Sequence, residues 1–169
     1  MRKTALALLT VVLVTSLRAY GVPAKPIKVR INGEQRAAKE VAKSIAARLQ
    51  GTQRYAVTDA VGDAELYLDL SCMEGKDVSR ASGYVCSFLI VYYPEKMATL
   101  RSLIGPYGLV TGPDVSSVAE DVFTTFVAAT TNEKLETAQK DLRLGVLNYC
   151  YSNFSDKNVQ SDCGQNIGK

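Results

Sequence analysis

The densest group of residues that could perform acid–base chemistry is a set of four carboxylates, Asp59, Asp63, Glu65 and Asp69. A glycosidase needs two carboxylates roughly 5–10 Å apart, one as acid and the other as base or nucleophile. Glu65 and Asp69 fall on the same face of a strand expected over residues 64–72, where the strand rise separates them by about 13 Å. We therefore expect solvated strand residues here, and a hydrolase that uses carboxylates alone is an alternative interpretation.

The chain contains no histidine. This excludes a Ser-His-Asp triad, a Cys-His pair, an imidazole acid or base and a zinc site with histidine ligands. Ser116 and Ser117 lack the G-x-S-x-G context of a hydrolase nucleophile, and residues 105–112 lack the spacing of a phosphate-binding loop. The sequence therefore predicts a protein that is not an enzyme and that needs no metal or cofactor.

Four cysteines are present, an even number that is typical of two disulfides in an oxidising compartment. Three pairings are possible. We favour a Cys72–Cys86 bridge, which would tie the base of a hairpin loop, and a Cys150–Cys163 bridge, which would clip the end of a helix to the C-terminal tail. A redox or metal role is disfavoured because the chain has no C-x-x-C pair.

Residues 1–21 have the pattern of a secretory signal peptide. The basic start, Met1-Arg2-Lys3, precedes an apolar run over residues 5–14 and the small residues Ala19 and Gly21. The run falls short of the ~20 residues that a stable membrane-spanning helix needs, and no cysteine follows it for lipid attachment. We expect cleavage of this segment and a location in the periplasm or outside the cell.

The formal charge of +3 belongs to this leader, because the chain beyond residue 21 has 17 basic and 17 acidic residues. Net charge therefore gives no argument for nucleic acid as a partner. The charges are nevertheless unevenly distributed along the chain. Residues 22–54 hold eight basic residues and two acids, whereas residues 55–169 hold nine basic residues and fifteen acids.

The basic region predicts a binding surface. Lys39 and Lys43 are one helical turn apart on the expected first helix, with Arg36 nearby, and the first strand could extend this stripe from its polar face. Tyr107, in a glycine-rich segment, could add an exposed aromatic contact. The candidate partner-binding residues are Arg36, Lys39, Lys43, Lys28, Arg30 and Tyr107. The alternative is that the acidic part of the chain covers the basic residues within the fold.

The periodicity of apolar residues predicts the elements that position these side chains. A strand over residues 25–31 precedes an amphipathic helix over residues 34–50, and the chain ends in two helices and a polar tail. Between the first helix and the last two lie a short strand at residues 55–58, strands at 64–72 and 83–93, a helix or strand at 95–103, and a turn-rich connection at 105–114 ending in the N-cap Asp114. The strand at 83–93 is apolar on both faces. The last two helices are expected at residues 115–127 and 130–150.

This order predicts one α+β domain over residues 22–151 and a disulfide-tethered tail over residues 152–169. We expect two layers, with a mainly antiparallel sheet of about four strands and helices on one face. The helix between the first two strands permits a local parallel pairing. The two C-terminal helices are expected to form a hairpin packed on the sheet.

Residues 41–70 resemble part of a known type of periplasmic α/β module. The helix ending at Leu49, the short strand near Tyr55 and the A-E-L strand from Ala64 are similar to the amino-terminal domain of TolB and to CsgG-like proteins of curli secretion. Those families act in envelope assembly by binding protein partners. The resemblance therefore implies a binding role in the cell envelope.

These observations predict an exported, non-catalytic binding protein with a protein partner, an acidic surface or an anionic envelope polymer as its target. We expect no nucleic acid partner and no stable membrane anchor. An alternative of the same size and compartment is an inhibitor or immunity-type antagonist of a secreted enzyme or toxin.

Overall fold

The computed structural model describes residues 25–60, 62–75, 83–93, 102–104 and 107–166. The expected signal peptide and most of the segment 95–103, for which helix and strand were both open, lie outside the described residues.

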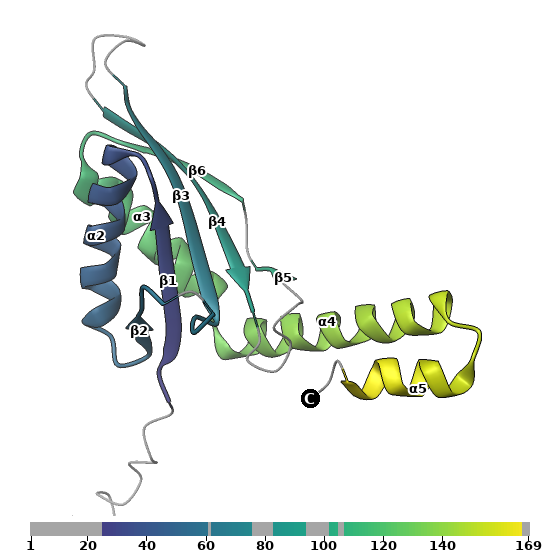
Figure 1. Ribbon diagram of the computed structural model, residues 1–169. Helices are drawn as coiled ribbons and strands as arrows, with labels where there is room; N and C mark the ends of the chain where they lie inside the picture. The colour runs from purple at the N-terminus through teal and green to yellow at the C-terminus, as the bar shows by residue number, and fades with distance from the viewer. Residues whose placement is uncertain (1–24, 61, 76–82, 94–101, 105–106, 167–169) are drawn as a thin grey trace, which may run out of the picture.

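Six strands among the described residues form one mixed sheet (Figure 1). Their order is β2-β1-β3-β4-β5, and β6 pairs with the same edge of β4 as β5. The strands are β1 (Ile27–Gly33), β2 (Tyr55–Val57), β3 (Leu66–Gly75), β4 (Gly83–Tyr92), β5 (Ser102–Leu103) and β6 (Gly108–Gly112). The α+β class is confirmed, and β4 lies inside the sheet as its apolar faces predicted.

The sheet is mixed and has six strands rather than about four, and it contains the local parallel pairing that the helix after the first strand permitted. β1 is parallel to both β2 and β3, while β4 is antiparallel to β3, β5 and β6. Helix α2 (Arg36–Gln50) carries the chain back along the sheet after β1, which makes the next strand parallel.

The segment 105–114, expected to be a turn-rich connection, contains strand β6. Gly108 reflects close packing rather than a turn, because it lies directly opposite Phe88 of β4. A Cβ atom at Gly108 would come within 2.2 Å of the Phe88 ring. The signal for β6 is therefore non-local, since it depends on the residue across the strand pair.

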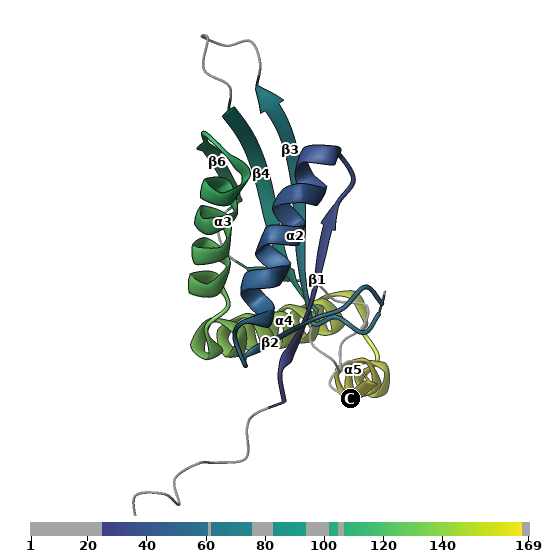
Figure 2. The same cartoon turned by 90° about the vertical axis from the view of Figure 1, so that its left-hand side faces the viewer.

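Helices α2 and α3 (Val115–Ala129) cover one face of the sheet, as expected (Figure 2). Their apolar sides form the core with the facing side chains of β1, β3 and β4. The largest fully buried side chains are Phe126, Ile45, Leu49, Leu66, Leu68 and Ile90. Asp114 is the N-cap of α3, as predicted, and its Oδ1 accepts a 2.8 Å hydrogen bond from the backbone N–H of Ser117. This bond holds the pKa of Asp114 below its usual value.

The two C-terminal helices do not form the expected hairpin on the sheet. Helix α4 (Asn132–Asn153) leaves the end of α3 at a steep angle and runs past the end of the sheet, away from α2 and α3 (Figures 1 and 2). Leu135 and Ala138 near its start belong to the core. The tail beyond it, expected to be polar chain held by a bridge, forms helix α5 (Lys157–Asn166). We call α4 and α5 together the arm.

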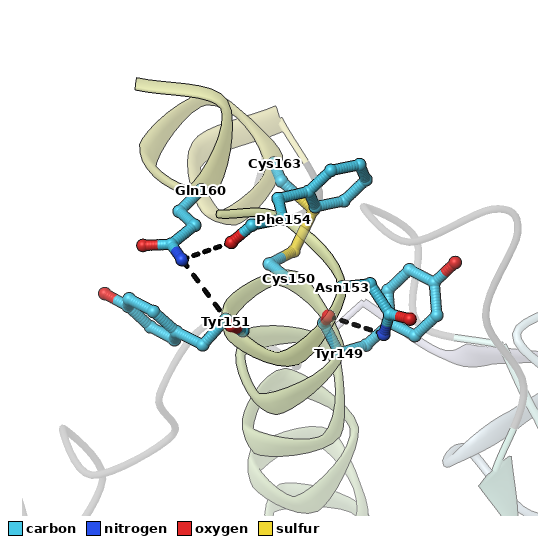
Figure 3. Close-up of a disulfide and its surroundings, with 7 residues drawn as sticks. All are labelled: Tyr149, Cys150, Tyr151, Asn153, Phe154, Gln160 and Cys163. Atoms are coloured by element: carbon cyan, nitrogen blue, oxygen red, sulfur yellow. Dashed lines mark hydrogen bonds between the residues drawn. A yellow bond between two sulfur atoms is a disulfide. The ribbon is translucent and has the colours of Figure 1, made fainter. Parts of the chain in front are cut away.

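Both preferred disulfides are present. Cys72 and Cys86 are directly opposite each other in β3 and β4, and both are buried in the core. Cys150 and Cys163 join α4 to α5 (Figure 3). The first bridge therefore reinforces the sheet, and the second reinforces the arm.

Candidate functional site

The outer face of α2 gathers three of the predicted binding residues. Ala38, Val41, Ile45 and Leu49 are buried against the sheet. At about 100° per residue, this places Arg36, Lys39 and Lys43 on the opposite side of the helix, where all three are exposed. We call these three residues the basic face of α2.

Two basic side chains of α2 have acidic partners. Arg36 forms an ion pair of 3.3 Å with Glu40, one turn along the helix. Arg48 pairs with Glu120 of α3, 72 residues away in the chain. By contrast, no hydrogen bond or ion pair joins the side chain of Lys39 or Lys43 to any other residue that the structure describes. From the acidic part of the chain, Glu120 thus neutralises Arg48, while Lys39 and Lys43 have no acidic partner among the described residues.

Lys28 and Arg30 lie on the other side of the sheet. Val29 between them is fully buried among the residues that pack on the helices. Because successive strand residues point to opposite faces, Lys28 and Arg30 point to the face that α2 and α3 leave open. The Nζ of Lys28 lies 3.3 Å from a carboxylate oxygen of Asp63. The sheet therefore separates Lys28 and Arg30 from the basic face of α2.

Tyr107 is exposed, as the binding hypothesis requires, but it is also remote from the basic face. It precedes β6, and strands β3 and β4 lie between β6 and β1. Tyr107 and the basic face of α2 therefore do not form one continuous surface.

Two of the four carboxylates near β3 contact polar side chains of β1. Asp63 is paired with Lys28, and Asp69 accepts a 2.6 Å hydrogen bond from the side-chain amide of Asn32. These contacts join neighbouring parts of the open sheet face. Among the described residues, no group of three or more His, Cys, Asp or Glu is placed to hold a metal ion.

A pocket of about 580 Å³ lies between the first turn of α2 and the β3–β4 pair. Two carboxylates, Glu40 and Glu74, line it together with Arg36 and Tyr84. Both carboxylates are exposed, and Glu40 is already paired with Arg36. The pocket thus adjoins the basic face and carries charges of both signs.

The arm carries a surface that the sequence reasoning missed. The buried residues of α4, Leu135, Ala138, Val146 and Cys150, lie on one face of the helix. Leu144, Leu147 and Tyr151 lie on another side of the helix and are exposed. Their spacing of three and four residues could have indicated a second apolar face of this helix. The same segment also contains the apolar residues that pack on the core, and these dominated the pattern.

Comparison with known proteins does not identify a family. No family model matches the chain, and no curated protein matches it. The solved structures it resembles include the hypothetical protein CT253 from Chlamydia trachomatis, with a TM-score of 0.36 and 9% sequence identity over 62% of this chain and 95% of that one. A likeness at this level carries no functional argument. In the part of the chain that the structure describes, no helix is long and apolar enough to span a membrane. The resemblance to TolB and CsgG-like modules stays a prediction.

Proposed function

We propose that the chain is an exported binding protein without catalytic activity, and that the basic face of α2 contacts an acidic region of a macromolecular partner. The observation that supports this is the state of Lys39 and Lys43. Both are exposed, they lie one turn apart, and neither has an acidic partner among the described residues. Charges of this kind steer an oppositely charged partner toward the surface and set its orientation.

This contact should be sensitive to salt. The Debye length is about 10 Å at 0.1 M salt and shortens as salt is added. Exposed lysines therefore lose most of their attraction for an acidic surface at high ionic strength. Binding that persists unchanged in high salt would depend on another surface.

The test is affinity capture from an envelope extract with the immobilised protein. The variant Lys39→Glu/Lys43→Glu should lose roughly tenfold or more of the captured partner, because each substitution replaces attraction with repulsion. The matched control is Lys28→Glu/Arg30→Glu, which reverses the same number of charges on the opposite side of the sheet. A second control, Lys39→Arg/Lys43→Arg, keeps the charge and should keep binding.

The possible results distinguish binding through the basic face of α2 from binding through the open face of the sheet. Loss of partner only in the α2 variant supports the proposal. Equal loss in both charge-reversal variants would indicate a general effect of charge, and loss only in the β1 variant would move the binding site to the open sheet face. Identification of the captured species as protein or polymer then decides the class of partner.

A second candidate function follows from the pocket beside α2. Glu40 and Glu74 line the same pocket, and a carboxylate-dependent hydrolase needs two carboxylates in one site. Hydrolysis of envelope glycans by the purified protein, abolished by Glu74→Gln without loss of folding, would favour this function over binding alone.

A further inference from the structure

The exposed apolar side chains of this protein are concentrated on the arm. Nine large apolar residues are exposed in the described part of the chain, and six of them lie between residues 144 and 159. These six belong to the distal half of α4, the α4–α5 turn and α5. An apolar surface gathered in this way is typical of an interaction site rather than of scattered surface residues.

Three of these residues form one stripe along α4. Leu144, Leu147 and Tyr151 follow the i, i+3, i+7 spacing of a helix-packing seam, and their exposed fractions are 48%, 38% and 65%. At 100° per residue, the stripe lies about a quarter turn from Cys150, which faces α5. We call these three residues the arm stripe.

We call the sheet with α2 and α3 the body. Among the described residues, neither the body nor α5 covers the arm stripe. Leu135 and Ala138 near the start of α4 pack on the core, and Cys150 is bonded to Cys163 of α5. In Figure 3, Tyr151 points to one side of α4, away from the bridge, and Tyr149 points to the opposite side. Two helices joined in this way leave a lateral face that a third helix could occupy.

We propose that the occupant is α4 of a second copy of this chain. The two stripes pair antiparallel around Leu147, so that Leu144 of one copy lies opposite Tyr151 of the other. Each α4 then has α5 on one side and its counterpart on the adjacent side. The product is a four-helix bundle with two-fold symmetry.

The charges around the stripe fit this antiparallel arrangement. Lys140 is seven residues before Leu147, about 10 Å along the helix, which is the level of the α4–α5 turn of the second copy. That turn contains Asp156, and Lys157 follows it at the start of α5. Glu136, one turn before Lys140, meets Lys157. A parallel pairing would instead bring each Lys140 against its own counterpart.

The shape of the molecule allows this pairing. The arm extends away from α2, α3 and the sheet (Figure 1). Antiparallel arms place the two bodies at opposite ends of the bundle.

The area predicts a weak dimer. If a large apolar residue exposes about 200 Å² when fully accessible, the arm stripe offers roughly 300 Å² per copy. Apolar atoms make up about 60% of an interface, so the total buried area would be about 1,000 Å². This lies at the lower limit for specific association, and we expect a dimer whose population rises with protein concentration.

Sedimentation equilibrium of the oxidised protein tests this proposal. The wild-type protein should show a concentration-dependent monomer–dimer equilibrium. Leu147→Glu should raise the dissociation constant roughly tenfold or more, because it places two carboxylates at the centre of the seam. Leu109→Glu changes an equally apolar, exposed residue on β6 and should leave the equilibrium unchanged.

A charge exchange tests the antiparallel register. Glu136→Lys should weaken the dimer, and adding Lys157→Glu should restore it, because the pair is re-formed with reversed signs. This pair leaves Asp156, which caps α5, unchanged. A double variant no better than Glu136→Lys would overturn the register. A wild-type protein that stays monomeric at every concentration would overturn the proposal, as would loss of a captured partner on Leu147→Glu with no change in self-association.

Discussion

The two disulfides offer a direct test of how this fold is stabilised. They close loops of nearly equal length, with sequence separations of 14 and 13 residues. In the chain-entropy model, each loop constrains the unfolded chain by about 3 kcal/mol. If loop length alone mattered, removal of either bridge would have the same effect.

The structure predicts different effects, because the bridges lie in different places. Cys72 and Cys86 are buried in the core between β3 and β4, so Cys72→Ala/Cys86→Ala should lower the free energy of unfolding by about 3 kcal/mol. At about 4 °C per kcal/mol, this reduces the Tm by about 12 °C. Cys150 and Cys163 join two helices of the arm, outside the sheet, so Cys150→Ala/Cys163→Ala should release α5 and leave the Tm of the body nearly unchanged.

Calorimetry and hydrogen exchange separate these outcomes. The first variant should melt at lower temperature as a single unit, whereas the second should keep its main transition and show fast amide exchange in α5. An equal fall in the Tm of both variants would refute this reasoning, because it would mean that the arm unfolds together with the body.

Two further predictions concern the body. Gly108→Ala should destabilise the protein by about 1–3 kcal/mol in denaturant unfolding, since the added Cβ overlaps the buried ring of Phe88, and full stability would show that the ring can move aside. Asp114→Ala should lower the Tm at neutral pH, because α3 loses its N-cap. The pKa of Asp114 is lowered in the folded protein, so its stabilisation is present above the pKa of the unfolded state and disappears as pH falls through the folded pKa. The Tm difference from wild type should therefore shrink in acid. A difference that persists there would contradict the conclusion that the ionised carboxylate of Asp114 stabilises α3.

Local patterns were sufficient for the elements that pack on the core. Helix α2 and strands β3 and β4 have strong apolar periodicities, and each appears within a few residues of its predicted bounds. Strand β6 was missed because its glycines are typical of turns, and only its pairing with β4 makes it a strand. Helix α5 was missed because its composition is polar, and its position depends on the bridge to α4.

For the candidate site, too, local sequence showed one part and the tertiary structure the other. The sequence alone determined that residues 22–54 are basic and that Arg36, Lys39 and Lys43 share a helix face. The sequence could not show whether acidic residues from the rest of the chain pair with these basic residues, because such acidic partners lie far away along the chain. Asp63 reaches Lys28 across 35 residues and Glu120 reaches Arg48 across 72, while Lys39 and Lys43 receive no acid from the described residues.

The sequence by itself therefore determined that no histidine-dependent chemistry is available and identified the main helices and strands, and it favoured the cysteine pairing that the structure contains. Each of these depends on composition or on residues close together along the chain. Only the tertiary structure decided that β1 is parallel to β3 as well as to β2, in which direction the arm runs and which charges stay uncovered. Those features depend on contacts between distant segments, where packing of the whole core determines which side chains meet.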